Sequence, residues 1–294
     1  MDSTCYQIDN WVRTVMIKWF VPEGSLVCEF YPGDGQDSGK WQRANVDHLT
    51  TIDQNELNIE KLIERCVRKK YEHLPLALVS DVSKQKIEWN NSQLLSWYSM
   101  EVDNLSVRPD IRILLTHEGI YDAVSCFSGV DRAFTDITTA ENLIYNASKL
   151  LKDGGTFFGI IPDSSVLFNR ANKQKVEEDG IIKCNGFELI LPKGHSVYDV
   201  FNSNLQKCPI FLRNPNEPKN IKELFLVHCP TFISLCSKHN LMLLEIQNLQ
   251  DFYEENRNIH SSTLKKMLGP IKIQIKDIQK FGLFACFSFR KVVS

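Results

Sequence analysis

The 294-residue sequence has no excess of basic charge and no long apolar run. Its 34 Lys and Arg residues against 36 Asp and Glu residues give a net charge of −2. Proteins that bind long stretches of nucleic acid along the phosphates usually carry a basic excess. This balance disfavours coating of a duplex but allows a nucleotide or one RNA end as ligand. No stretch approaches the roughly 18 consecutive apolar residues of a transmembrane helix, so we expect no membrane association.

Metal-ligand spacing is also missing. The nine cysteines are scattered without a C-x-x-C pair, and the seven histidines form neither H-x-H nor H-x-x-x-H. Protein zinc sites commonly use such short spacings, so we expect no metal. An odd number of dispersed cysteines disfavours a disulfide framework and indicates reduced, mostly buried thiols.

The sequence does contain short apolar runs that alternate with amphipathic helical patterns. Apolar residues at i, i+3 and i+4 predict helices, and continuous runs between turn residues predict buried strands. The predicted strands are residues 25–31, 48–53, 76–80, 121–127 and 156–161, and the predicted helices are 8–20, 57–67 and 137–151. This order predicts an α/β, doubly wound, mostly parallel sheet with helices on both faces. Residues 241–247 and 281–293 could complete it as a seven-stranded sheet.

The remaining segments are less regular. We interpret residues 1–294 as a single domain with an irregular insertion around 165–220, because no flexible linker interrupts the chain. A helix is predicted from about 222 to 239. Asp9 and Asn10 could cap the first predicted helix, since their side chains accept hydrogen bonds from free backbone N–H groups.

Residues suited to a nucleoside follow three of the predicted strands. Gly33 and Gly35 follow the first strand and would let the backbone approach a ligand closely. Asp53 ends the second strand, where a carboxylate can accept ribose hydroxyls, and Asp81 follows the third, within reach of an adenine edge. Ligands of doubly wound sheets lie outside the carboxyl ends of the strands, so these residues predict a nucleoside site.

The turn after the first strand does not suit a dinucleotide. The G-x-G-x-x-G fingerprint would need a third glycine where Ser38 stands, and Asp34 and Asp37 would repel a pyrophosphate. S-adenosylmethionine carries an ammonium, a sulfonium and no phosphate. Acids at Glu29, Asp34 or Asp37 would favour those cations, so S-adenosylmethionine is the expected cofactor.

Several motifs resemble those of the mRNA cap guanine-N7 methyltransferases. Residues 10–13 (NWVR) resemble the family's N-N-W-I-K, and residues 27–37 (VCEFYPGDGQD) with Lys40-Trp41 resemble V-L-D-L-G-C-G-K-G-G-D and K-W. Residues 150–159 (LLKDGGTFFG) resemble L-x-P-G-G-x-F-x-G. Further segments at 226–230 and 251–257 continue the similarity, which is strongest to the divergent second cap methyltransferase of plants. The resemblance implies a Rossmann-like methyltransferase fold.

The resemblance also implies roles for individual residues. Arg13 stands where the family has a Lys that touches the methionine carboxylate, Glu29 replaces the motif Asp, and Tyr31 replaces a Gly. Asp53 and Asp81 match the ribose and adenine acids. The implied cofactor-binding set is Arg13, Glu29, Tyr31, Gly33, Asp53, Asp81 and Phe127.

The implied cap-binding set is Asp9, Asn10, Glu223 and Phe284. This part departs most from the family. Phe127, Asp131 and Arg132 stand in columns where the family has Gln, His and Tyr. Leu224 occupies the column of a guanine-recognising Glu, with Glu223 beside it, and Phe284 replaces a Tyr.

Methyl transfer to guanine N7 needs no general base, because N7 attacks through a lone pair and loses no proton. Positioning can supply most of the catalysis, which fits a sequence without a catalytic triad or carboxylate dyad. The expected partner is the 5′ cap guanosine of RNA, with capping or transcription proteins as further partners in the nucleus. Two alternatives stay open: a methyltransferase fold that has lost catalysis and serves as a binding module, and a methyltransferase for another small acceptor.

Overall fold

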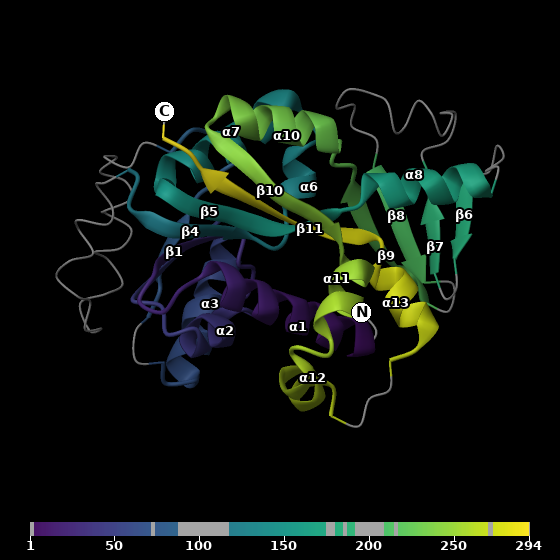
Figure 1. Ribbon diagram of the computed structural model, residues 1–294, viewed down its shortest axis with the longest axis horizontal. Helices are drawn as coiled ribbons and strands as arrows, with labels where there is room; N and C mark the ends of the chain where they lie inside the picture. The colour runs from purple at the N-terminus through teal and green to yellow at the C-terminus, as the bar shows by residue number, and fades with distance from the viewer. Residues whose placement is uncertain are drawn as a thin grey trace.

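A seven-stranded sheet forms the centre of the computed structural model (Figure 1). The strand order is β10-β11-β5-β4-β1-β2-β3, and β11 runs in the direction opposite to the other six strands of this sheet. The strands are β1 (Leu26–Phe30), β2 (His48–Asp53), β3 (Leu76–Val79), β4 (Tyr121–Cys126), β5 (Leu151–Pro162), β10 (Leu241–Asn248) and β11 (Phe284–Lys291). The structure describes residues 3–71, 74–87, 118–174, 180–184, 187–191, 209–214, 217–269 and 273–293. The predicted seven-stranded, mostly parallel sheet is confirmed.

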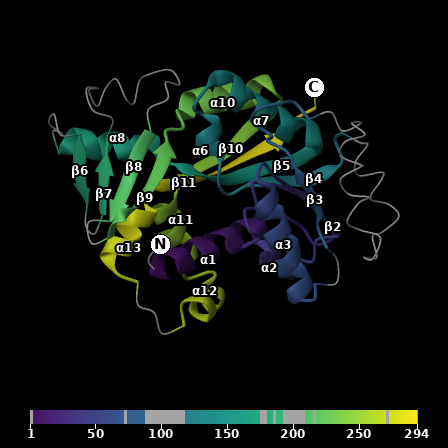
Figure 2. The same cartoon turned by 180° about the vertical axis from the view of Figure 1, so that it is seen from behind.

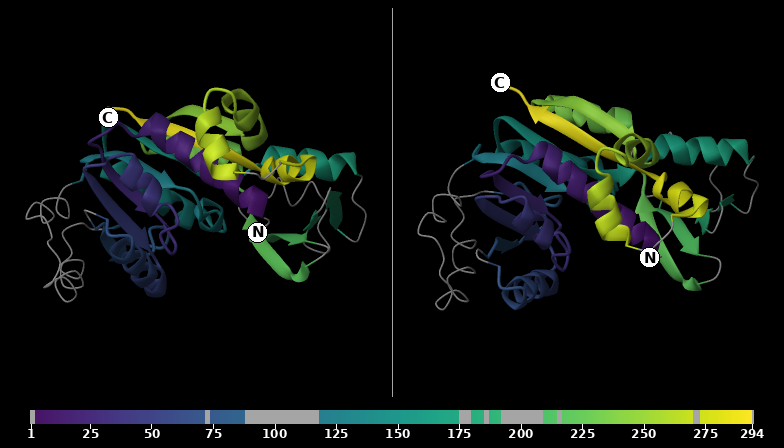
Figure 3. Two further views of the ribbon diagram at one scale, coloured as in Figure 1. Left: turned by 90° about the horizontal axis from the view of Figure 1, so that it is seen from below. Right: turned by 60° about the horizontal axis from the view of Figure 1, so that its bottom comes forward.

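Helices cover both faces of this sheet (Figures 1 and 2). One face carries α6 (Val130–Ala133), α7 (Ile137–Leu150) and α10 (Cys229–Lys238). The other carries α1 (Ser3–Phe20), α2 (Ser38–Arg43), α11 (Leu249–Asn256) and α12 (Ser261–Leu268). Helix α3 (Glu56–Arg68) packs against β2 and β3, and α13 (Ile275–Phe281) packs against α1 and α11. Figure 3 shows α1 lying lengthwise under the sheet beside α12.

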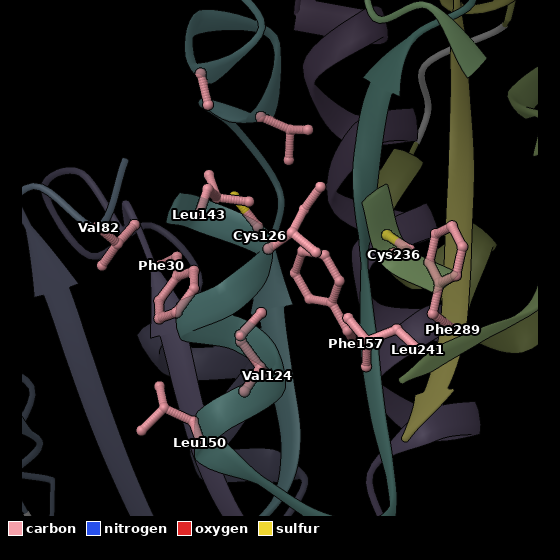
Figure 4. Close-up of a cluster of buried hydrophobic side chains, with 14 of the residues drawn as sticks. Phe30, Val82, Val124, Cys126, Leu143, Leu150, Phe157, Cys236, Leu241 and Phe289 are labelled. Carbon is pink, nitrogen blue, oxygen red and sulfur yellow. The ribbon is translucent and has the colours of Figure 1, made fainter. Parts of the chain in front are cut away.

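Alternate residues of the central strands supply the two cores. Phe157 packs into the core below α7 and α10, together with Leu143, Cys236 and Phe289 (Figure 4). Its neighbour Phe158 belongs to the core under α1. Because successive side chains of a strand point to opposite faces, a strand covered on both sides must be apolar throughout. This explains the continuous apolar runs of the sequence. Of the described helices, none is long and apolar enough to cross a membrane.

A second sheet lies partly within the segment that was expected to be irregular. Four antiparallel strands follow the order β6-β7-β8-β9, next to α8 (Ser164–Lys173). They are β6 (Ile181–Cys184), β7 (Phe187–Ile190), β8 (Pro209–Asn214) and β9 (Glu217–Phe225). The expectation of irregular structure at 165–220 is therefore wrong for its described part. Strands β6 and β7, with four residues each, are too short to give a clear periodic signal. The single-domain interpretation stays a prediction.

Two predicted helix starts are also corrected. The helix expected from about 222 begins only at Cys229, because β9 continues to Phe225. Helix α1 begins at Ser3, so Asp9 and Asn10 lie inside it and do not cap it. Asp9 instead forms an ion pair with Arg13, one helical turn along α1. The Asn10 side chain accepts a hydrogen bond from Lys40 of α2.

Candidate functional site

The carboxyl ends of β1 to β4 meet where the strand order reverses. The chain passes from β1 to β2 and β3 on one side, whereas β4 lies on the other side of β1. Such a switch point is where doubly wound sheets bind ligands. The structure brings five of the expected cofactor residues to this edge: Tyr31, Gly33, Asp53, Asp81 and Phe127.

Hydrogen bonds to Asp53 connect the turn after β1 to the end of β2. One carboxylate oxygen accepts a hydrogen bond from the Gly33 N–H at 3.1 Å. The other accepts from the Asn55 N–H at 2.9 Å and from the Asn58 amide at 3.2 Å. Gly35 has a φ of +76°, and a Cβ there would lie 2.8 Å from the Leu62 side chain. The glycine at position 35 thus allows close packing against α3.

Asp81 accepts hydrogen bonds from two other residues. One of its oxygens accepts from the Tyr31 hydroxyl at 2.8 Å and from the Ser83 N–H and hydroxyl at 3.0 and 2.7 Å. Lys84 lies 3.4 Å from the other oxygen. Although burial opposes it, these hydrogen bonds lower the pKa of Asp81. The acid expected to meet adenine is ionised and already engaged by the chain.

Arg13 lies in a buried ionic network between α1 and the turn before α2. Its guanidinium contacts Asp37 at 2.7 Å and Asp9 at 2.8 Å. Lys40 binds the second oxygen of Asp37 and also donates to the Asn10 side chain at 2.7 Å. Burial opposes ionisation of Asp37, but Arg13 and Lys40 lower its pKa. The Nε of Arg13 is buried without a partner among the described residues.

Glu29 is the most deeply buried acid of the site, with 2% of its surface exposed. It accepts a hydrogen bond from the Trp41 indole N–H at 2.9 Å. Burial, reinforced by the charge of Asp37, raises the pKa of Glu29 to about 8. Its carboxyl group is therefore protonated at neutral pH. In the strand register it lies between Thr51 and Ser125, whose hydroxyls are buried without partners in the described structure.

The charge argument made from the sequence needs correction. Glu29 is neutral, Asp37 is paired with two cations, and Asp34 is paired with Arg65 at 2.7 Å. None of the three acids presents an uncompensated charge to a cationic ligand. The sequence shows their presence but not their partners, which come from other elements.

Phe127 fills the space beneath the Arg13 guanidinium. Its ring centroid lies 5.2 Å from the guanidinium carbon, and the ring also packs against Trp41 and Phe158. Only 4% of Phe127 is exposed. Its contacts support the position of Arg13 through a cation–π arrangement.

The expected cap residues are spread over three elements. Asp9 and Asn10 lie on α1, in contact with the ionic network. Glu223 is exposed on β9, whereas its neighbour Leu224 is buried in the core of the small sheet. Phe284 is half-buried at the start of β11 and packs against the cores under α1 and of the small sheet. Glu223, and not Leu224, is the residue that can reach a ligand.

Two contributors, Lys40 and Trp41, were not assigned a role from the sequence, and Asp37 was expected only to favour a cationic ligand. Asp37 and Lys40 form the centre of the ionic network, and Trp41 holds Glu29. The Lys40-Trp41 pair was visible as a motif, but its contacts depend on how α2 packs. Asp131 accepts a hydrogen bond from the Phe225 N–H at 3.4 Å and so connects α6 to β9.

Comparison with known proteins gives one consistent family. A sequence model of the mRNA (guanine-N(7))-methyltransferase domain matches residues 4–282. The chain is 26% identical to mRNA cap guanine-N(7) methyltransferase 2 of Oryza sativa, with 97% of this chain and 80% of the relative covered. It is also 26% identical to the Arabidopsis thaliana protein of the same name, over 99% and 78% of the two chains.

Solved structures share the fold at low sequence identity. The CcbJ methyltransferase from Streptomyces caelestis matches with a TM-score of 0.52 and 11% identity, over 97% of this chain and 90% of that chain. A methyltransferase from Clostridium acetobutylicum, described as S-adenosylmethionine-dependent, matches with a TM-score of 0.50 and 9% identity, over 98% and 92%. These matches show the architecture alone.

Proposed function

Because the chain belongs to the mRNA (guanine-N(7))-methyltransferase domain family, we propose that it transfers a methyl group from S-adenosylmethionine to N7 of the cap guanine of mRNA. One observation carries this proposal: the family match extends over residues 4–282 of a 294-residue chain. It includes every residue of the carboxyl-edge site and the small sheet.

The residues of the carboxyl edge fit the cofactor at three places. Asp53 would accept the ribose hydroxyls, as its carboxylate lies at the end of β2 beside the glycine turn. Arg13, with its unpaired Nε, would bind the methionine carboxylate. Glu29 lies nearby as a buried carboxyl that an ammonium group would ionise. The space beside Asp81 is the exception, since the Tyr31 side chain already contacts that acid.

When bound, S-adenosylmethionine supplies a methyl group activated by its sulfonium. Guanine N7 releases no proton on attack, so the protein needs to orient two ligands and to exclude water. Effective molarities of well-oriented reactants account for about 7–11 kcal/mol of a barrier, which is enough for positioning to dominate. In this proposal Asp53 and Arg13 orient the donor, and Asp9, Asn10, Glu223 and Phe284 contribute to the cap site.

A second function is favoured by two departures from the family. Asp131 stands in a column where the family has a site residue, but here it connects α6 to β9. Leu224 replaces the guanine-recognising Glu and is buried. These changes favour a methyltransferase fold that binds a ligand without catalysis. A methyltransferase for another small acceptor is the third candidate, and an acceptor screen tests it.

The proposed reaction also suggests where the protein works. Cap methylation takes place on nascent mRNA, so we place the protein in the nucleus together with capping or transcription proteins. Its RNA contact would be confined to the cap, in keeping with the net charge of −2.

A methylation assay tests the function directly. RNA capped with GpppG is incubated with labelled S-adenosylmethionine, and the digested product is analysed for 7-methylguanosine. We expect N7 methylation. Binding of S-adenosylhomocysteine without any methylation would favour the binding module, and methylation of another acceptor alone would favour the third candidate.

A thermal-shift titration with S-adenosylhomocysteine tests the site. The wild type should be stabilised and Asp53→Ala should not. Asp122→Ala is the matched control, because Asp122 also accepts a backbone N–H, from Leu26 at 2.8 Å, but lies near the opposite end of β4. Loss of the shift in both variants would show a general folding effect and would contradict the assignment of Asp53.

A further inference from the structure

Tyr31 has an unusual backbone conformation at the switch point. It follows β1 directly and has a φ of +54°, in the left-handed region that favours glycine. The conformation is sterically unfavourable for a bulky side chain, so it persists only where surrounding contacts hold it. The contacts of the ring therefore show what holds it.

The Tyr31 ring fills the space between the loops after β1 and β4. Gly129, with a φ of +99°, has no side chain, and a Cβ there would lie 2.6 Å from Cδ2 of the ring. The Arg132 guanidinium carbon lies 5.7 Å from the ring centroid. Only 7% of Tyr31 is exposed. Gly129 and Arg132, which follow β4, thus form the surface against which this ring packs.

The hydroxyl of Tyr31 reaches across to the loop after β3. It donates to Asp81 at 2.8 Å, on the oxygen that also accepts two hydrogen bonds from Ser83. The side chain therefore extends from the end of β1 to the acid after β3, along the carboxyl edge at which a nucleoside would lie. Packing against Gly129 holds the Tyr31 ring, and the hydrogen bond to Asp81 holds its hydroxyl.

We propose that the Tyr31 side chain is an internal occupant of the adenosine subsite, which must leave its contact with Asp81 before S-adenosylmethionine or S-adenosylhomocysteine can bind. This inference rests on the proposed function and adds a regulatory element to the same site. While Tyr31 contacts Asp81, the subsite is closed. The apparent association constant of the cofactor is therefore the intrinsic constant multiplied by the fraction of molecules in which the subsite is open. Conditions or partners that displace Tyr31 would increase cofactor binding without touching the cofactor.

Calorimetric titration of S-adenosylhomocysteine into the wild type and two variants tests this inference. Tyr31→Phe removes the bond to Asp81 and should lower the dissociation constant about threefold or more. Tyr31→Gly also empties the subsite and should lower it tenfold or more. Glycine tolerates the positive φ, so this variant is expected to fold. Tyr121→Phe is the control, because its hydroxyl is bonded to Thr50 at 2.7 Å in the core and away from the edge.

The outcomes separate this inference from the function on which it rests. Tighter binding in both Tyr31 variants, with Tyr121→Phe unchanged, supports an internal occupant. Equal or weaker binding in the variants overturns it and leaves the methyltransferase assignment intact. If neither the wild type nor any variant binds S-adenosylhomocysteine, the cofactor assignment fails. The inference then fails as well, because removal of the Tyr31 side chain exposes no cofactor site.

Discussion

Charged residues are buried at the carboxyl edge of the large sheet but exposed or partly exposed in the small sheet. At the edge, Asp37 and Lys40 are 3% and 5% exposed and contact each other and Arg13. In the small sheet the charges lie outside an apolar core: Arg213 pairs with Glu188 at partly exposed positions, and Glu223 is exposed. One region buries a polar network, and the residues described in the core of the other are apolar.

The difference indicates which region is fixed by its own packing. A buried ion pair must keep its geometry, because loss of one partner leaves an unpaired charge away from water. Surface charges are screened and can change with little effect on stability. The buried ionic network at the carboxyl edge is therefore fixed in one geometry, whereas the exposed charges of the small sheet can adapt. We expect acceptor specificity to depend on the latter.

Asp37→Ala should give the largest effect on stability. The change leaves Arg13 and Lys40 without their shared acid, and breaking a buried pair costs about 3–5 kcal/mol. Urea unfolding of the two proteins measures the difference in unfolding free energy. Asp34→Ala is the matched control in the same turn. Its pair with Arg65 is about one-third exposed on both sides, so the expected loss is about 1 kcal/mol or less.

Equal losses in the Asp37 and Asp34 variants would contradict the contrast between buried and exposed charge. Asp37→Asn sharpens the test, because asparagine keeps an acceptor but not the charge. An intermediate loss is expected for this variant if charge pairing, and not hydrogen bonding alone, stabilises the network.

Glu29→Gln should change how stability depends on pH. Burial raises the pKa of Glu29 from 4.5 to about 8, so the folded protein retains a proton that the unfolded chain releases. The unfolding free energy of the wild type therefore falls as pH rises from about 4.5 to about 8, and levels off above. The fall is on the order of 1 kcal/mol per pH unit. Glutamine does not titrate and keeps an acceptor for Trp41.

Urea unfolding at several pH values measures this difference. The variant should gain stability relative to the wild type across the window, and the gap should stay constant below it. Parallel curves over the whole range would show that Glu29 is ionised in the folded protein. Trp41→Phe provides a further check, since it removes the indole donor and should raise the pKa of Glu29 further.

The sequence was sufficient for the large sheet but not for the small one. Strands such as β1 and β4 are mostly apolar stretches between turn residues, with one acid in each, and that signal is local. Strands β6 and β7 have four residues each and pair with each other as a local hairpin, with Cys184 opposite Phe187. Runs this short give little periodic signal, so strand length limits the prediction here.

The same reasoning applies to the site. Acids after strands, such as Asp53 and Asp81, can be placed at one edge because parallel strands share a direction. Their hydrogen-bond partners cannot be predicted in this way, because a contact such as that between Tyr31 and Asp81 joins residues 50 positions apart. The neutral state of Glu29 likewise depends on burial, which the sequence does not show.

Glu223→Gln should give the smallest effect on stability, and a selective effect on function. Glu223 is exposed, so the unfolding free energy should change by about 0.5 kcal/mol or less. If its carboxylate accepts hydrogen bonds from guanine, kcat/KM for capped RNA should fall about tenfold, equivalent to about 1.4 kcal/mol, with unchanged binding of S-adenosylhomocysteine. Glu245→Gln, an exposed acid on β10, serves as the control. Because Leu224 is buried, retention of full activity by Glu223→Gln would move guanine recognition away from β9, leaving Asp9 and Asn10 of α1 as the next residues to test.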